Sequence, residues 1–129
     1  MSRNAARVLF AMILLQAVHG AEEFALEFWN KFPPMRAIYG PDSALGRALF
    51  IAFHMLLIGF GAWCYVQVRH STARARTAMM LWILIQCGTV VAHLVWMALA
   101  PGFQPGLITL PLFLVSIAAG MAALKRGSV

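Results

Sequence analysis

The chain has 129 residues, of which 62% are hydrophobic and only 11% are charged, and its mean hydropathy is +0.80. Soluble domains are about 45–50% apolar and about 25% charged, so this composition excludes both a soluble globular domain and a disordered chain. Ten Lys and Arg against four Asp and Glu give a net charge of +6, which is typical of chains that meet nucleic acid or a membrane.

Four apolar stretches are long enough to cross a bilayer, which takes about 20 residues. They cover roughly residues 7–29, 45–68, 77–99 and 107–124, and polar or Pro- and Gly-rich turns separate them. Asp42 or Ser43 is the expected N-cap of the second stretch. We therefore predict one all-α domain over residues 1–129, a four-transmembrane-helix bundle in contact with the lipid bilayer.

The positions of the cations predict the orientation of this bundle. Because cytoplasmic loops carry an excess of Lys and Arg, the side with more cations is the cytoplasmic one, and it carries both termini. The same distribution spreads the positive charge along the edges of four spans, so we expect no nucleic-acid partner. The cytoplasmic side has Arg3, Arg7, Arg69, Arg74, Arg76, Lys125 and Arg126, and the other side has Lys31, Arg36 and Arg47.

Residues 1–20 also have the features of a signal peptide. Arg3 and Arg7 precede an apolar run over residues 8–18, and small residues follow up to Ala21. Cleavage there would leave three spans and a periplasmic N-terminus, and it would cut through the most distinctive residues of the chain. We therefore favour a retained first helix, and N-terminal sequencing of the purified protein distinguishes the two.

Three ionisable residues lie close together in the first span. His19, Glu22 and Glu23 stand at i, i+3 and i+4, which share one face of a helix. A charged group in the hydrocarbon costs several kcal/mol unless it is paired, hydrated or bound to a metal. The alternative is a helix that ends near Val18 and leaves these residues among the headgroups. Residues 8–18 alone are too short to span, whereas a helix that continues to Trp29 ends at an aromatic belt.

An estimate of depth brings other histidines to the same level. At about 1.5 Å per residue, His19 lies about 18 Å from the cytoplasmic side, and Glu22 and Glu23 lie about 22–24 Å from it. By the same measure His93 lies about 24 Å and His54 about 20 Å from that side. Three helices therefore place three histidines and two carboxylates in one layer of the outer half. We expect Glu27, one turn beyond Glu23, to be solvated.

Each histidine outside the first span has a structural alternative. His54 could equally be hydrogen-bonded to a neighbouring helix without further function. His93 shares a face with Gln86 and Thr89, and this polar stripe is expected to line a cavity. Gln16 is expected to extend the polar face of the first helix.

Other residues carry no sign of a site. Cys64 and Cys87 fall inside the second and third spans, at no spacing that indicates zinc, and we expect them to be buried small apolar residues. His70 lies in the cytoplasmic loop beside Arg69 and gives no functional signal.

Imidazoles and carboxylates at helical spacing are suitable ligands for Fe, Mn or Zn. A mononuclear site of two or three His and one or two Glu fits the residues present, with His19, Glu22, Glu23 and His93 as ligands and His54 as an addition. The metal would supply the positive charge that lets both carboxylates ionise. Without a metal, a His–Glu pair is a proton relay or a general acid/base pair.

Two blocks of the sequence resemble a known family. Residues 19–23 read His-Gly-Ala-Glu-Glu, which is the H-x-x-E-E signature near the N-terminus of the HXXEE-motif proteins, small bacterial membrane proteins with four helices. After His93, the run over residues 101–109 resembles the family's aromatic-x-Pro-Gly-x-x-Thr turn, with Phe103, Pro105, Gly106 and Thr109 at the matching positions. The resemblance covers nearly the whole chain in order and spacing. It implies a place in the bacterial inner membrane and a polar centre of His19, Glu22, Glu23 and His93, but it implies no particular reaction.

Three functions fit these observations. The first is a metal-dependent membrane enzyme acting on a lipid-like substrate that enters from the outer leaflet, with His19, Glu22, Glu23 and His93 as ligands or acid/base groups. The second is a carrier of protons or metal ions, or a small-molecule-binding bundle, acting as an oligomer without catalysis. The third is a metal-free acid/base isomerase with an apolar ligand in an aromatic cavity.

Overall fold

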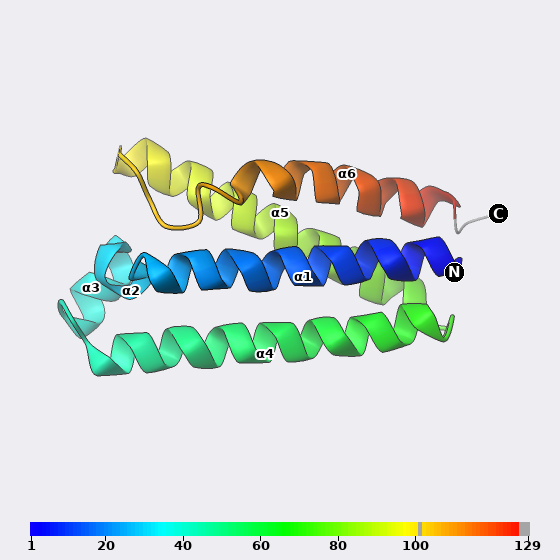
Figure 1. The fold of residues 1–129 in the computed structure, drawn as a ribbon, viewed down its shortest axis with the longest axis horizontal. Helices are drawn as coiled ribbons and strands as arrows, with labels where there is room; N and C mark the ends of the chain where they lie inside the picture. The colour runs from blue at the N-terminus through cyan, green and yellow to red at the C-terminus, as the bar shows by residue number, and fades with distance from the viewer. Residues whose placement is uncertain (101, 127–129) are drawn as a thin grey trace.

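A computed structural model describes residues 1–100 and 102–126, and within these ranges the chain is all-helical, with six helices and no strand (Figure 1). Pro101, the first residue of the turn expected before the last span, lies outside the described residues. The helices are α1 (Arg3–Ala25), α2 (Phe28–Lys31), α3 (Pro33–Tyr39), α4 (Ala44–Arg69), α5 (Ala75–Leu99) and α6 (Leu110–Arg126).

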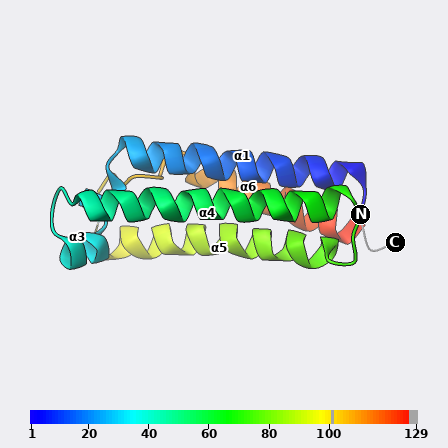
Figure 2. The ribbon, with the colours of Figure 1, turned by 90° about the horizontal axis from the view of Figure 1, so that it is seen from below.

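The four long helices run along the long axis of the molecule in both ribbon views (Figures 1 and 2). α1 packs against α4 and α6, and α5 packs against the same two helices. α1 begins and α6 ends at one end of the molecule, here called the termini end (Figure 1). α2 and α3 lie at the opposite end, here called the loop end.

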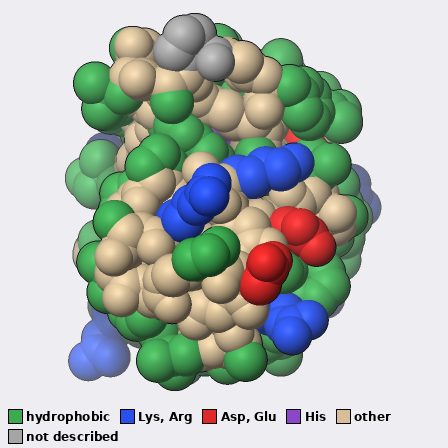
Figure 3. Space-filling model, turned by 90° about the vertical axis from the view of Figure 1, so that its left-hand side faces the viewer, with side chains coloured by type: hydrophobic (Ala, Val, Ile, Leu, Met, Phe, Trp, Pro, Cys, Tyr) green, Lys and Arg blue, Asp and Glu red, His purple; other side chains and the backbone are tan. Residues whose placement is uncertain are grey.

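Three helices, α1, α4 and α5, are long and apolar enough to cross a membrane, which indicates a multi-pass membrane protein. Large apolar side chains on their outer faces are exposed, among them Leu56 and Leu84. The fourth predicted span is the helix α6, which has 17 residues and begins at Leu110 rather than near residue 107. At the loop end, cations and acids share the exposed surface, and hydrophobic side chains surround them at the rim (Figure 3).

The first helix ends at Ala25, so the prediction that it continues to Trp29 is wrong. Glu27 adopts a left-handed conformation with φ of 55°, which ends the helix, and α2 starts at Phe28. Trp29 is buried against Phe24 and Phe50 in this short helix. The alternative of a helix that ends near Val18 is also wrong, because α1 carries its regular backbone through the whole His-x-x-Glu-Glu segment.

Ser43, not Asp42, caps α4. The Ser43 hydroxyl accepts a hydrogen bond from the Gly46 amide at 3.1 Å, in the usual manner of an N-cap. Asp42 has a φ of 54° and is paired with Asn30, whose side-chain amide donates to the Asp42 carboxylate at 2.7 Å. Asp42 therefore fastens α2 to the start of α4. Glu27 is exposed, as predicted.

The larger of two apolar clusters fills the half of the molecule near the termini end, and a smaller one around Phe113 packs beside His19. The largest members of the first cluster are Leu9, Met12, Met79 and Trp82, contributed by α1 and α5, and the ends of α4 and α6 close it. Cys64 belongs to this core and Cys87 packs at its edge, both as free thiols. Cys64 is buried as predicted, whereas Cys87 is only half-buried. The polar residues of interest lie in the other half.

Candidate metal centre

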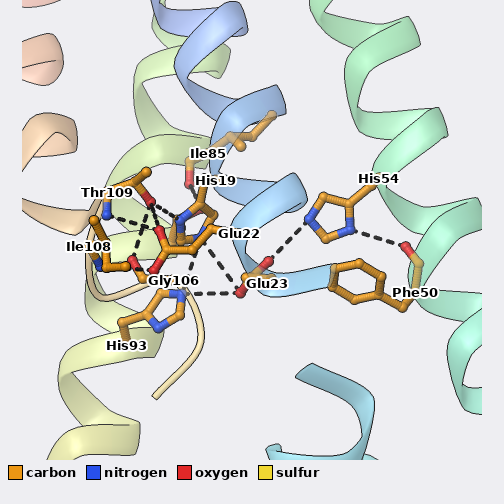
Figure 4. Close-up of polar contacts among 11 residues, drawn as sticks. His19, Glu22, Glu23, Phe50, His54, Ile85, His93, Gly106, Ile108 and Thr109 are labelled. Carbon is orange, nitrogen blue, oxygen red and sulfur yellow. Dashed lines mark hydrogen bonds and ion pairs between the residues drawn. The ribbon is translucent and has the colours of Figure 1, made fainter. Parts of the chain in front are cut away.

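The side chains of His19, Glu23 and His93 meet in the loop half, between α1 and α5 (Figure 4). Nε2 of His19 lies 3.2 Å from Nε2 of His93, and Oε1 of Glu23 lies 3.6 Å from the first nitrogen and 3.3 Å from the second. All three residues are buried. One atom from each residue could thus bind the same ion, with the three ligand atoms within 4.8 Å of one another.

His54 reaches the same carboxylate from α4. Its Nε2 lies 3.2 Å from Oε2 of Glu23, the oxygen that does not face the other two histidines. Its Nδ1 lies 3.0 Å from the carbonyl oxygen of Phe50, and since a carbonyl only accepts, this nitrogen carries a hydrogen. Nε2 can donate to Glu23 only if the ring carries both protons and is therefore charged. Glu23 thus connects α1 to both α4 and α5.

Glu22 does not face this group. Its carboxylate accepts hydrogen bonds from the backbone amides of Ile108 and Thr109, at 2.9 and 3.0 Å, and from the Thr109 hydroxyl at 2.7 Å (Figure 4). These donors belong to the turn before α6, so Glu22 anchors that turn to α1. The sequence predicts Glu22 as a ligand beside Glu23, and the structure instead separates the two adjacent carboxylates.

Thr109 links Glu22 to His19 and determines the tautomer of the imidazole. The hydroxyl has one hydrogen, and its oxygen partners are Glu22 at 2.7 Å and the Gly106 carbonyl at 3.3 Å. Nδ1 of His19 lies 2.7 Å from the same hydroxyl, so Nδ1 must be the donor in that contact. In a neutral ring Nε2 then has a free lone pair, and it is this nitrogen that faces His93 and Glu23. Hydrogen bonds of this kind hold metal-binding histidines in orientation.

Two glycines make room for the histidines. A Cβ added at Gly20 would overlap Cδ2 of His54, so only glycine lets that ring reach Glu23. A Cβ added at Gly106 would lie 2.6 Å from Cε1 of His19 and 2.6 Å from Cε1 of His93. Gly106 also has a φ of +91°, which side chains other than glycine rarely adopt. The turn before α6 therefore closes directly over the two rings.

A cavity of about 620 Å³ lies beside the His and Glu group in the loop half. His19, Glu23, His54 and His93 lie in its lining. Most of the remaining wall is apolar, with residues from α2 and α3 as well as from the long helices, including Phe28, Phe32, Phe50, Phe53, Leu57 and Trp96.

The predicted polar stripe on α5 is divided between two environments. Thr89 lines the cavity together with His93, as expected. Gln86 instead bridges three helices, because its amide donates to the Met12 carbonyl at 2.9 Å and its oxygen accepts from the Ser116 hydroxyl at 2.7 Å. Gln16 of α1 is buried in the cavity wall, and its Oε1 has no hydrogen-bond partner within the described part of the chain.

Sequence reasoning did not identify three residues that shape the group. The sequence marks Thr109 and Gly106 only through the resemblance of residues 101–109 to a family pattern, and it marks Gly20 only as a spacer in the H-x-x-E-E signature. Their roles depend on contacts between helices distant in the chain, and spacing within one helix carries no signal of these. No family model matches the chain, and no curated protein or solved structure matches it.

Proposed function

We propose that the chain is a four-span protein of the bacterial inner membrane, with both termini in the cytoplasm, and that it belongs to the HXXEE-motif family. The fourth span would be α6, whose 17 residues are at the short end of the length that crosses a bilayer. Its position beside α1 and α5 supports this assignment. The seven cations near the termini end against three near the loop end support the orientation.

We propose further that His19, Glu23 and His93 bind one divalent ion of Fe, Mn or Zn. The observation that carries this proposal is the spacing of the three ligand atoms. Metal–ligand bonds of about 2.1 Å at angles of 90–110° separate neighbouring ligand atoms by about 3.0–3.4 Å. The observed separations are 3.2, 3.3 and 3.6 Å, so a small inward shift of Glu23 towards His19 would complete the set.

Two histidines and one carboxylate are a donor set used by catalytic zinc sites and by non-haem iron sites. Three protein ligands leave coordination positions free, and the cavity gives a substrate access to them. An ion held in this way supplies a Lewis acid or activates a bound water. His54, on the second oxygen of Glu23, would orient that carboxylate or exchange protons with a bound ligand.

The cavity supports a lipid-like substrate. Leu49 and Phe53 of α4 and Gly88 and Ala92 of α5 line it and are themselves exposed, so it opens on the flank between these helices. A Cβ added at Gly88 would meet no described atom within 4 Å, which leaves that side open. An apolar chain could enter there from the bilayer. The unpartnered oxygen of Gln16 would accept a hydrogen bond from a hydroxyl or amine of the head of the substrate.

We therefore assign the chain as a metal-dependent membrane enzyme that acts on a lipid-like substrate. Metal analysis of the detergent-purified protein tests this assignment, with His19→Ala, Glu23→Gln and His93→Ala as variants. Wild type should carry close to one ion per chain, and each variant should lose most of it. The matched controls are His70→Ala and Glu27→Gln, which change the same residue types at exposed positions and should keep the ion.

Metal well below one ion per chain, unchanged by the three ligand variants, would overturn the metal site. The catalytic part has its own measurement, in which membrane lipid extracts are incubated with metal-loaded wild type, with metal-loaded Glu27→Gln, and with His93→Ala treated with the same metal. Mass spectrometry should find a lipid species converted by wild type and by Glu27→Gln but not by His93→Ala. Extracts that stay identical in all three samples would contradict an enzyme while leaving the metal site standing.

A metal-free acid/base site is the second candidate, and one observation favours it. The 3.2 Å between Nε2 of His19 and Nε2 of His93 is also a hydrogen-bond distance, if the hydrogen is on His93. Glu23 and His54 would then form the ionised pair. This candidate predicts full retention of ligand binding after exhaustive chelation, whereas the metal site predicts its loss.

The core argues against a carrier. An ion leaving the group towards the termini end would have to pass Met12, Met79 and Trp82, which are almost completely buried in close apolar packing. Proteoliposomes loaded with a metal-sensitive dye should therefore show no flux above that of empty liposomes. A flux that Glu23→Gln abolishes would favour the carrier over the enzyme.

A further inference from the structure

A second cavity lies at the termini end, far along the bundle from the His and Glu group. Its volume is about 520 Å³, and its walls come from the first turns of α1 and the last turn of α4. Arg3 and Arg7 line it from α1, and Tyr65 and Arg69 line it from α4. Ala6 and His70 complete the lining.

Three arginines line the cavity, and none of the described residues in its wall carries a negative charge. Arg3 and Arg7 are one turn apart on the same helix, where like charges repel each other. Arg69 adds a third positive charge from the facing helix, and no Asp or Glu side chain of the described residues lines the cavity. The four acids of the chain are Glu22, Glu23, Glu27 and Asp42, and the contacts of each place it in the loop half. Within the described part of the chain, these cations therefore have no neighbouring carboxylate, and a bound anion would supply the missing charge.

A side-chain hydrogen bond joins the two segments that form the walls. The Ser71 hydroxyl donates to the Met1 carbonyl at 2.9 Å, which fastens the start of α1 to the loop after α4. This contact lies beside the cavity, where it joins the two segments that carry Arg3, Arg7 and Arg69. The cavity therefore lies where the ends of α1 and α4 meet, with the exposed side chains of Arg3, Arg7 and Arg69 around it.

The position of the cavity indicates the kind of anion. It lies where α1 and α4, both long and apolar enough to span, reach the surface of the bilayer. Lipid phosphates occupy that level, and guanidinium groups bind phosphate through paired hydrogen bonds. A basic pocket between spanning helices is a suitable site for the headgroup of an anionic lipid. The side chain of Phe10 is exposed and packs beside Tyr65. It would face the acyl chains of the lipid, below the level of the phosphates.

We propose that this cavity binds the headgroup phosphate of an anionic phospholipid from the leaflet at the termini end. Arg3, Arg7 and Arg69 contact the phosphate oxygens, and the Tyr65 hydroxyl donates a further hydrogen bond. The proposal is independent of the metal site and holds whether or not the protein is an enzyme.

Native mass spectrometry of the detergent-purified full chain tests the proposal, with phosphatidylglycerol, phosphatidylcholine and glycerol phosphate as probes. Wild type should bind phosphatidylglycerol in preference to phosphatidylcholine, and glycerol phosphate should compete only weakly. Arg3→Gln, Arg7→Gln and Arg69→Gln should each weaken phosphatidylglycerol binding by about fivefold, the effect expected for one cation at the membrane surface. Arg36→Gln, an exposed arginine of α3 at the other end, is the matched control and should bind as wild type does.

Arg69→Lys distinguishes a specific loss of lipid binding from a loss caused by misfolding. This variant keeps the positive charge and removes only the paired hydrogen bonds. Its affinity should fall between those of wild type and Arg69→Gln. Equal binding of the two phospholipids, or losses no larger than that of Arg36→Gln, would overturn the site. Glycerol phosphate that binds as tightly as the lipid would overturn the assignment to a lipid and identify a site for a soluble phosphate ester.

Discussion

Thr109 controls which nitrogen of His19 is free, although it contributes no ligand atom itself. Its hydroxyl accepts a hydrogen bond from Nδ1 of His19 and donates one to the Glu22 carboxylate. That carboxylate also accepts hydrogen bonds from two backbone amides. Loss of such an orienting partner usually costs 10- to 100-fold in metal affinity. Thr109→Val should therefore weaken metal binding by about that factor, measured by competition with a chromophoric chelator.

Thr109→Ser keeps the hydroxyl and serves as the matched variant. It should bind metal with nearly wild-type affinity, since the donor and acceptor of the relay are both present. Equal affinities in wild type and Thr109→Val would show that the relay does not orient His19. A loss in Thr109→Ser as large as that in Thr109→Val would show that the hydroxyl alone does not account for the effect.

Alanine substitutions at Gly106 and Gly40 separate the effect of backbone strain from the effect of a steric clash. Both have positive φ, +91° and +81°, so alanine at either is strained by about 1–3 kcal/mol. Only at Gly106 would the added Cβ also collide with two imidazoles, whereas at Gly40 it would meet no described atom within 4 Å. Gly106→Ala should lose about 1–3 kcal/mol more stability than Gly40→Ala, and it alone should lose metal.

Thermal unfolding in detergent, with and without added metal, gives both quantities for this pair. Added metal should raise the Tm of wild type and of Gly40→Ala but not that of Gly106→Ala. Equal responses of the two variants to metal would mean that the turn before α6 does not lie against the histidine rings.

The residues of the group could be predicted from the sequence only in part. Depth along each helix was enough to bring His19, Glu23, His54 and His93 to one level. The role of Glu22 could not be predicted, because adjacent residues on a helix point about 100° apart and only one of the two carboxylates can follow His19 into the cavity. The positions of α5 and of the turn before α6 decide which of the two carboxylates enters the cavity. The sequence of α1 alone does not contain these positions.

At the scale of the helices, Gln16 and Gln86 have opposite roles despite similar burial. Gln86 joins α5 to α1 and α6 through two hydrogen bonds. Gln86→Leu leaves the Met12 carbonyl and the Ser116 hydroxyl with fewer partners, so it should lower the free energy of unfolding by about 1–3 kcal/mol. Metal content should not change, because Gln86 does not line the cavity.

Gln16→Leu is the natural comparison. Oε1 of Gln16 is buried and has no partner among the described residues, and burying such an atom costs free energy. The substitution removes this cost, so the free energy of unfolding should stay the same or rise. It should weaken the binding of a substrate with a polar head. Thermal unfolding of the two variants side by side tests this difference, and a larger loss for Gln16→Leu would reverse the assigned roles.

The helices themselves were predicted well, and their ends were not. Apolar length alone located the bodies of α1, α4 and α5, since a span must be apolar throughout. The end of α1 depends on the left-handed conformation of Glu27, and the cap of α4 was decided by the pairing of Asp42 with Asn30. Both are contacts of the loop end, where several backbone conformations suit the same residues.

At the scale of the whole molecule, four spans predict that both termini lie on the same side of the membrane. A tag at each terminus should be cleaved by protease only when the cytoplasmic face of the vesicles is exposed. The N-terminal tag should remain on the purified protein, whereas cleavage of a signal peptide would remove it. If the two tags are cleaved from opposite faces of the membrane, the protein has three spans and α6 is not one of them.

The most direct test of the central claim is a crystal structure of the metal-loaded protein with anomalous data collected at the absorption edge of the bound metal. We predict one anomalous peak about 2.1 Å from Nε2 of His19, Nε2 of His93 and Oε1 of Glu23. The peak should lie on the cavity side of the three residues, and it should vanish in Glu23→Gln crystals grown with the same metal. Metal-loaded crystals with no anomalous peak among these three residues would contradict the account.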